Sequence, residues 1–330
     1  MSTTLRLEVH RITLEKKVRD KKGGREFFQK CHYSELLKAF DPNKNKALGK
    51  LWNGFITYFN GEFLTNTDCD KALTTTKKAK YTVASERNII NGEVSGGPTN
   101  REQSIFKRKN AKNKTGNVSD DDVVSSDFYI KLWLPYDYES GVLMIQSYSN
   151  ANVSDLVRTH FRKYIQTRGF RVIISSYFPK SFEEKRKKGS NVVSVSYVKD
   201  KLPKGKLKLL NPLFAEYENL NVRIVVSGFS TPAEEFIKKF KGDGPALATD
   251  IEALEMKKDG DQNVLTTYRD ESGRTSVFKI DEERLRDFSY IYLPEEINLI
   301  GKNTYDFNEI VRHTDEILEI IKDEIKYNKK

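Results

Sequence analysis

The residues with the most suggestive spacing for catalysis are two carboxylates and a lysine in the second half of the chain. Glu255 and Lys257 form a Glu-x-Lys pair, and Asp250 lies upstream of them. In many metal-dependent nucleases two carboxylates hold the ion at such a spacing, and the lysine stabilises the attacking water. Residues 251–256 also read as a helix without a catalytic role, and the sequence favours this second interpretation. A Mg²⁺ cofactor is therefore expected only if the nuclease interpretation holds.

Other patterns of metal or nucleophile chemistry are missing or have a simpler explanation. The acidic run Asp120, Asp121 and Asp122 offers the oxygen ligands that Mg²⁺ prefers, but its polar surroundings favour a solvated segment. The four histidines are spaced too widely for a metal motif, and Cys31 and Cys69 have no paired spacing. The sequence contains neither a Gly-x-x-x-x-Gly-Lys-Ser/Thr phosphate loop nor a Gly-x-Ser-x-Gly elbow. It therefore predicts no metal site and no cofactor.

A row of cations on one predicted helix is a clearer pattern. From Val153 onwards apolar residues recur every three or four positions, which indicates an amphipathic helix. Its outer face has no acidic residue after Asp155 and carries only basic side chains, namely Arg158, Arg162, Lys163 and Arg168. Unpaired guanidinium groups bind phosphate in a bidentate manner and lose little hydration. The row therefore predicts a site for nucleic acid or another polyanion.

Further basic and aromatic residues surround this row in the sequence. Two segments that read as loops of the same sheet carry Lys185, Arg186, Lys187 and Lys188 and, later, Lys204 and Lys206. The sequence weighs two interpretations of them equally, an extension of the row and a solubilising surface. Four aromatic residues can stack on bases where they are exposed, namely Tyr129, Trp133, Tyr136 and Tyr138. Of these, Tyr129 and Trp133 more often complete a second face of a core.

Residues 127–177 contain the elements that must position the row. Apolar residues alternate over 128–134 and return over 142–145, which predicts two strands joined by a turn. Ser154 can cap the start of the helix, and Gly169 can end it in a left-handed conformation. A third strand follows over 172–177. A hairpin, a helix and a strand together predict a sheet with one helix laid across it.

The rest of the chain predicts an α+β fold with mixed or antiparallel sheets. Residues 1–122 read as a β-rich N-terminal region with a bulge near Arg11, a helix over 33–40 and a hairpin at Asn60-Gly61. Residues 123–300 read as an α+β domain. Opposite charge blocks within 107–122 predict a mobile connection between the two regions.

The C-terminal region, residues 301–330, predicts one amphipathic helix over about 305–327. Its apolar stripe is long, and its opposite face is acidic. Such a helix can pack back onto the sheet of its own domain, which is the commoner arrangement. It can also bury the stripe against a second copy or another protein, and the sequence leaves both arrangements open.

Length and charge define the broad class of protein. The chain has 330 residues, of which 37 % are hydrophobic and 32 % charged, as in a folded globular protein. Its 57 Lys and Arg against 47 Asp and Glu give a net charge of +10, which favours polyanionic partners. No apolar run reaches the length of a signal peptide or a membrane span, so a cytoplasmic protein is expected.

The order of the motifs resembles that of poorly characterised bacterial phage-defence and abortive-infection proteins. The resemblance lies in the Asn-Gly-Glu-Val-Ser-Gly-Gly run of 91–97, the strand of 128–135 ending in Leu-Pro, and the Gly-Val-Leu-Met-Ile-Gln-Ser run of 141–147. It covers roughly residues 55–177 and transfers no catalytic residue. It implies a prokaryotic protein that acts on, or senses, invading nucleic acid or a phage protein, in a complex with other proteins.

Together these patterns favour a nucleic-acid-binding component of an anti-phage defence system over an enzyme. The first alternative is a metal-dependent nuclease effector built on Asp250, Glu255 and Lys257. The second is a protein-interaction scaffold or a sensor of a phage protein.

Overall fold

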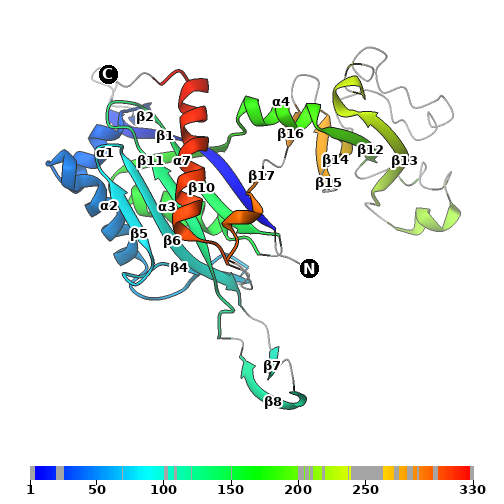
Figure 1. Ribbon diagram of the computed structural model, residues 1–330, viewed down its shortest axis with the longest axis horizontal. Coiled ribbons are helices and arrows are strands. Elements are labelled where there is room, and N and C mark those ends of the chain that lie inside the picture. The colour runs from blue at the N-terminus through cyan, green and yellow to red at the C-terminus, as the bar shows by residue number, and fades with distance from the viewer. Residues whose placement is uncertain are drawn as a thin grey trace. The chain divides into compact units, whose positions relative to one another are not determined.

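The computed structural model describes 4–19, 26–68, 70–99, 103–107, 110–119, 121–149, 151–199, 204, 208, 211–217, 220–236, 238, 263–270, 275–280, 285–287, 290–299 and 304–327. The chain forms two compact units (Figure 1). Unit 1 comprises Met1–Phe178 and Ser289–Lys330, and unit 2 comprises Pro179–Phe288. Helices and mostly antiparallel sheets confirm the α+β class. No helix in the described part of the chain is long and apolar enough to cross a membrane.

Unit 1 is built on a 10-stranded sheet in which the described pairs of strands are all antiparallel. The main path runs through β11 (Phe170–Ser176), β1 (Leu5–Arg19), β10 (Ser140–Tyr148), β9 (Ser126–Trp133), β6 (Ile89–Pro98), β4 (Lys71–Thr74) and β3 (Leu64–Thr65). Off this path, β2 (Glu26–Lys30) and β17 (Tyr290–Tyr292) pair with β1, and β5 (Tyr81–Ala84) pairs with β6.

Helices cover both faces of this sheet (Figure 1). One face carries α1 (Tyr33–Phe40), α2 (Lys44–Tyr58) and α3 (Ser154–Gln166), and the other carries α7 (Phe307–Glu324). Helix α2 lies close to the sheet because Gly92 has no side chain: a Cβ atom there would meet the Trp52 ring at 2.3 Å. The sheet is therefore a middle layer, and its strands need apolar residues on both faces.

The predicted central unit is confirmed as β9, β10, α3 and β11. Helix α3 is followed by Gly169 in the predicted left-handed conformation, with φ of 80°. The capping prediction differs in detail, because Val153 occupies the N-cap position and the Asn152 side chain accepts a hydrogen bond from Ser154 N at 2.7 Å. Strand β1 lies between β10 and β11, so a strand distant in sequence completes the unit.

Two local predictions in the N-terminal region are wrong. The predicted hairpin at Asn60-Gly61 is the end of helix α2, because residues with positive φ (51° and 77°) serve a helix C-terminus as well as a turn. Strand β1 pairs with β10 without a register shift, so it has no bulge at Arg11 in this ladder. Its buried apolar residues change from one face to the other between Val9 and Ile12 without a bulge.

The C-terminal helix α7 packs back onto the sheet, as the commoner arrangement predicts. Its buried residues are Phe307, Ile310, Thr314, Ile317, Leu318 and Ile321. Trp133 of β9 makes an edge contact with Tyr327, with ring centroids 4.8 Å apart. Because these apolar side chains are buried within one chain, they are not available for an association interface.

The two units do not coincide with the three regions expected from the sequence. The boundary expected at residue 122 falls inside one sheet, since β6 pairs with β9 across it. The segment 107–122, predicted as a mobile connection, contains β8 (Asn110–Val118), which pairs with the preceding β7 (Gln103–Lys107). Unit 2 is an insertion between β11 and β17 of unit 1.

Unit 2 contains a 5-stranded antiparallel sheet in the order β13, β12, β14, β15, β16. Its elements are α4 (Lys180–Lys188), β12 (Ser190–Lys199), η1 (Pro212–Glu216), β13 (Val222–Pro232), β14 (Asn263–Asp270), β15 (Thr275–Ile280) and β16 (Leu285–Asp287). A small core of Val192, Val195, Tyr197, Ala233 and Tyr268 holds the sheet together. The remaining short element, η3 (Glu295–Ile297), belongs to unit 1.

We expect unit 1 to fold when residues 179–288 are replaced by a short Gly/Ser linker. The two ends of the insertion lie side by side on β1, since Tyr177 N donates to Val9 O at 2.9 Å and Tyr290 pairs with Glu8. A linker of about four to six residues therefore closes the gap at a small entropic cost. A single cooperative urea transition by circular dichroism is the expected result. A soluble product without a cooperative transition would show that unit 1 needs unit 2.

Candidate nucleic-acid interface on helix α3

Helix α3 is held rigidly against the sheet of unit 1. Its apolar side is buried through Leu156, Val157, Phe161, Tyr164 and Ile165. The Tyr164 hydroxyl donates to Leu51 O of α2 at 2.9 Å, and a Cβ on Gly54 would meet that hydroxyl at 2.2 Å. The opposite side of the helix is left to polar residues, which include the predicted row of cations.

A buried polar cluster fixes the start of α3. Glu8 of β1 accepts hydrogen bonds from the Ser154 hydroxyl at 2.6 Å and from the Asn152 amide at 2.8 Å. His10 Nε2 lies 3.3 Å from the same carboxylate. Burial by itself raises the pKa of Glu8, but His10, Ser154 and Asn152 together lower it. An ionised carboxylate therefore sits where the positive end of the helix dipole favours it.

The first two cations of the row are half-buried and oriented by backbone carbonyls. Arg158 Nε donates to Ser154 O at 3.2 Å, and Arg162 Nη2 donates to Ile174 O of β11 at 3.2 Å. These bonds use only part of the donor capacity of each guanidinium group. Burial lowers the pKa of Arg162, and the neighbouring charge of Arg158 lowers it further. The pair is therefore pre-oriented and mutually repulsive, which an anion would relieve.

The other two cations lie on the last turn of the helix and just beyond its end. Lys163 and Arg168 are exposed, and the Arg168 guanidinium lies 4.9 Å from the centre of the Phe40 ring. Within the described part of the chain, none of the four cations forms an ion pair with a carboxylate. The acidic residue of the helix, Asp155, instead lies 4.0 Å from Lys71. The structure therefore places Arg158, Arg162 and Lys163 on α3 and Arg168 in the turn that follows it.

The second predicted group of cations lies on a helix rather than on a loop. Lys185, Arg186, Lys187 and Lys188 fall within α4, where Glu183 and Glu184 share the helix with them. Lys204 is exposed, whereas Lys206 lies outside the described residues. These positions belong to unit 2 and α3 belongs to unit 1, so a joint surface stays a prediction.

The weaker catalytic and metal candidates receive no support. Asp250, Glu255 and Lys257 lie outside the described residues, as does Asp120. The Asp122 carboxylate accepts hydrogen bonds from Ser119 N at 2.8 Å and Ser119 Oγ at 2.9 Å, so it forms a local turn. The described ranges contain no group of three or more His, Cys, Asp or Glu residues that could hold a metal ion.

The predicted stacking aromatics belong mainly to the core. Tyr129 is fully buried and Trp133 is 1 % exposed, so both complete the second face of the sheet beneath α7. Tyr138 contacts Tyr327, with ring centroids 5.5 Å apart. Lys44 Nζ lies 4.5 Å from the centre of the Tyr136 ring. The described contacts of these rings involve Lys44 and Tyr327 and not the row on α3, so base stacking by this set receives no support.

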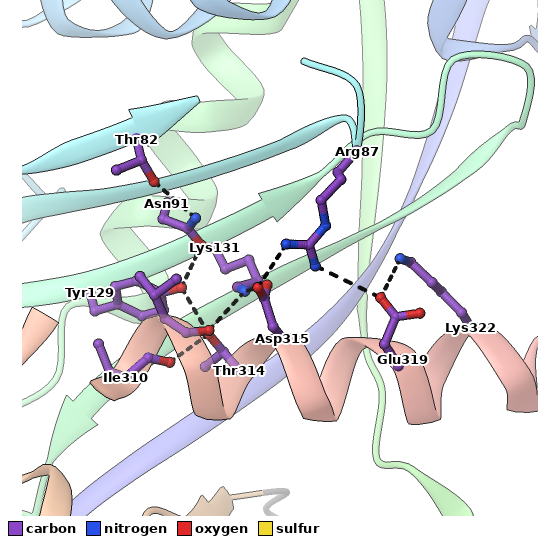
Figure 2. A network of polar contacts seen from close by, with 11 residues as sticks. Thr82, Arg87, Asn91, Tyr129, Lys131, Ile310, Thr314, Asp315, Glu319 and Lys322 are labelled. Atoms are coloured by element: carbon purple, nitrogen blue, oxygen red, sulfur yellow. Dashed lines mark hydrogen bonds and ion pairs between the residues drawn. The ribbon is translucent and has the colours of Figure 1, made fainter. Parts of the chain in front are cut away.

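A buried lysine beneath α7 is the polar feature that sequence reasoning missed (Figure 2). The side chain of Lys131 on β9 is fully buried, and it pairs with Asp315 and donates to Val311 O at 3.3 Å. Arg87 also pairs with Asp315, at 3.0 Å, and lies 3.9 Å from Glu319. Burial lowers the pKa of Lys131 to about 8, despite the opposing effect of Asp315.

A second branch of this network joins the strands to the same helix (Figure 2). The Tyr129 hydroxyl donates to Asn91 Oδ1 at 2.7 Å and lies 2.9 Å from the Thr314 hydroxyl. Asn91 in turn donates to Thr82 at 3.1 Å. A lowered lysine pKa is a common mark of a functional site, but this ammonium group is sealed between a strand and a helix. We therefore assign the network a structural role. The available sequence signal was the alternation of Tyr129, Lys131 and Trp133 on one strand face.

Removing one partner of the buried ion pair should destabilise the protein more than removing both. Asp315→Ala leaves the Lys131 ammonium buried with one carbonyl, which costs about 3–5 kcal/mol. Lys131→Met costs less, because Asp315 retains Arg87 and is 24 % exposed. The double variant should recover most of the loss. Urea unfolding measures each value, with the exposed Asp323→Ala on the same helix as control. Strictly additive losses would contradict this assignment.

The stability that Lys131 contributes should depend on pH. Its folded pKa of about 8 lies below the usual value of 10.5, so between these values the unfolded chain binds more protons. Stability therefore rises with pH through this window. From pH 7.5 to 9.5 wild type should gain about 1–2 kcal/mol relative to Lys131→Met in urea unfolding. A constant difference between the two proteins would show that Lys131 keeps its usual pKa.

Comparison with known proteins gives no match for this chain. A scan against protein-family models, a search of the curated proteins and a search of the solved structures each find none. Function is therefore inferred from the chemistry of the residues themselves, among which the row on α3 is the best-defined group.

Proposed function

We propose that this protein binds nucleic acid through the basic row of α3, formed by Arg158, Arg162, Lys163 and Arg168, as a component of a prokaryotic defence system. The observation that carries the proposal is the absence of a carboxylate partner for these four cations within the described residues. Other cations of unit 1 are paired, such as Lys50 with Asp41 at 2.7 Å. An unneutralised row on a rigid helix fits a run of phosphates.

The geometry of the row supports recognition of the sugar-phosphate backbone of a nucleic acid rather than of its base sequence. Arg158 and Arg162 are one helical turn apart, about 6 Å along the axis, and each keeps free N–H groups. Phosphate contacts of this type set affinity and register without reading sequence. The net charge of +10 adds long-range attraction to any polyanion. The proposed activity is therefore non-specific binding that weakens steeply with salt.

The defence role rests on the order of motifs over residues 55–177 and is the less direct part of the proposal. A nucleic-acid-binding component of such a system would hold the invading molecule for a partner protein. The nuclease alternative depends on Asp250, Glu255 and Lys257, outside the described residues, and no observation favours it over binding.

Replacing Arg158 and Arg162 together by Glu should weaken binding to every nucleic-acid sequence alike. Neither side chain belongs to the buried side of α3, so the fold should be retained. The slope of log affinity against log salt should fall by roughly 1.4 to 1.8 units, about 0.7 to 0.9 per lost contact. Titration of labelled oligonucleotides at several salt concentrations measures this slope.

Lys77→Glu with Lys78→Glu is the matched control, since both residues are exposed in a turn and the change in net charge is the same. Equal slopes for the two double variants would refute the row as the binding site. Incubation with Mg²⁺ or Mn²⁺ adds the test of the nuclease alternative, which requires cleavage that Glu255→Ala abolishes. Protection of cells against phage that is lost in the Arg158 and Arg162 variant alone would support the defence role.

A further inference from the structure

Strand β2 exposes two adjacent phenylalanine rings. Phe27 is 49 % exposed and Phe28 is 41 % exposed, and all five residues of β2 are exposed. Phe28 pairs directly with Lys17 of β1, and Phe27 pairs with Val18, so the rings lie on opposite faces of the ribbon. Two exposed aromatic rings on a short edge strand add nothing to the core and favour aggregation, so they call for a functional explanation.

The Phe28 ring is covered by an oriented guanidinium group. Arg171 Cζ lies 4.0 Å from the ring centre. Glu15 of β1 holds this group, accepting from Arg171 Nε at 2.7 Å and from Nη2. The Arg171 side chain is 51 % exposed, so the stack of ring and guanidinium presents a flat surface to solvent. Aromatic rings and guanidinium planes are the two surfaces on which proteins stack unpaired bases.

This stack follows the basic row of α3 along the chain but lies on the opposite face of the sheet. Arg162 binds the backbone of β11 at Ile174, and Arg168 stands at the turn between α3 and β11. On β11, Val172 and Ile174 are buried on the side of α3, whereas Arg171 alternates with them and lies opposite Glu15 of β1. A single strand bound along the row would therefore pass over the edge strand β11 to bring its bases to the stack.

Three cations around β2 each lie close to a carboxylate. Lys17 pairs with Glu26, Lys30 lies 3.8 Å from Glu139, and Arg171 pairs with Glu15. At these described positions the charges cancel, and the chemistry that they leave accessible is the stack itself. A duplex keeps its base faces inside and gains nothing from such a surface, whereas a single strand offers them.

We infer that the Phe28–Arg171 stack is a base-stacking platform across the edge strand β11 from the α3 row, and that the ligand is single-stranded nucleic acid. This inference rests on the proposed function, because the row supplies the phosphate contacts. The stacking residues expected from the sequence are largely buried. The Phe28–Arg171 pair takes their place, and it is recognisable only in the folded chain.

The test compares binding of a 20-nucleotide single strand and of a duplex of equal length, by fluorescence anisotropy at constant salt. Phe28→Leu should weaken binding of the single strand roughly 5- to 100-fold and leave duplex binding unchanged, since one base-stacking contact is lost. Phe28→Trp keeps a stacking surface and should bind the single strand at least as tightly as wild type. Phe63→Leu, at a phenylalanine that is 39 % exposed elsewhere on unit 1, is the matched control and should match wild type.

The outcomes separate this inference from the proposed function. One outcome is that wild type binds both ligands equally, with an affinity that Phe28→Leu leaves unchanged and that the Arg158 and Arg162 double variant reduces. This result would overturn the stacking platform but would still support the row on α3 as the binding site. Binding of neither ligand by wild type would overturn both. If Phe28→Leu fails to fold by circular dichroism, weaker single-strand binding by folded Phe28→Trp would overturn the platform, and wild-type or tighter binding would support it.

Discussion

The pairing of one strand with four others is the constraint on which unit 1 depends. Strand β1 has 15 residues and pairs with β10 and β2 along one edge and with β17 and β11 along the other. It therefore joins the start of the chain, the central hairpin, the strand after α3 and the return from the inserted unit. It also supplies Glu8, which holds the start of α3, and Glu15, which orients Arg171. A single strand thus positions both ends of the candidate interface.

The face of the sheet that α7 covers contains buried polar groups. Helix α7 meets a strand face on which Lys131 lies between two aromatic rings, and a buried ammonium group is costly unless it is paired. Asp315 supplies the partner, and Arg87 joins the same carboxylate from outside. The Tyr129 and Thr314 hydroxyls add a second polar contact between the strand and the helix. These contacts fix the register of α7 on the sheet, which apolar packing alone specifies less sharply.

Cations that are paired with a carboxylate differ from cations that are available to bind a ligand. Most cations of unit 1 for which a partner is defined sit opposite a carboxylate, as Lys17 does opposite Glu26, and such exposed pairs contribute little to stability. The row on α3 differs because Arg158 and Arg162 donate to backbone carbonyls and, among the described residues, have no carboxylate partner. Net charge alone does not reveal this contrast, since paired and unpaired cations contribute equally to it.

The sequence by itself determined the elements whose signals are local. The helix and the strands over residues 127–177, the helix that ends before Asp41 and the basic row of α3 all follow from short-range periodicity and turn chemistry. Tertiary structure decided which turn Asn60-Gly61 forms, because positive φ suits a helix end and a hairpin alike. It also decided that Lys131 is buried and that Arg171 stacks on Phe28, residues 143 positions apart in the numbering (171 minus 28). Such contacts depend on which strands pair through β1 and which helix covers each face, and no local pattern in a single chain encodes that choice.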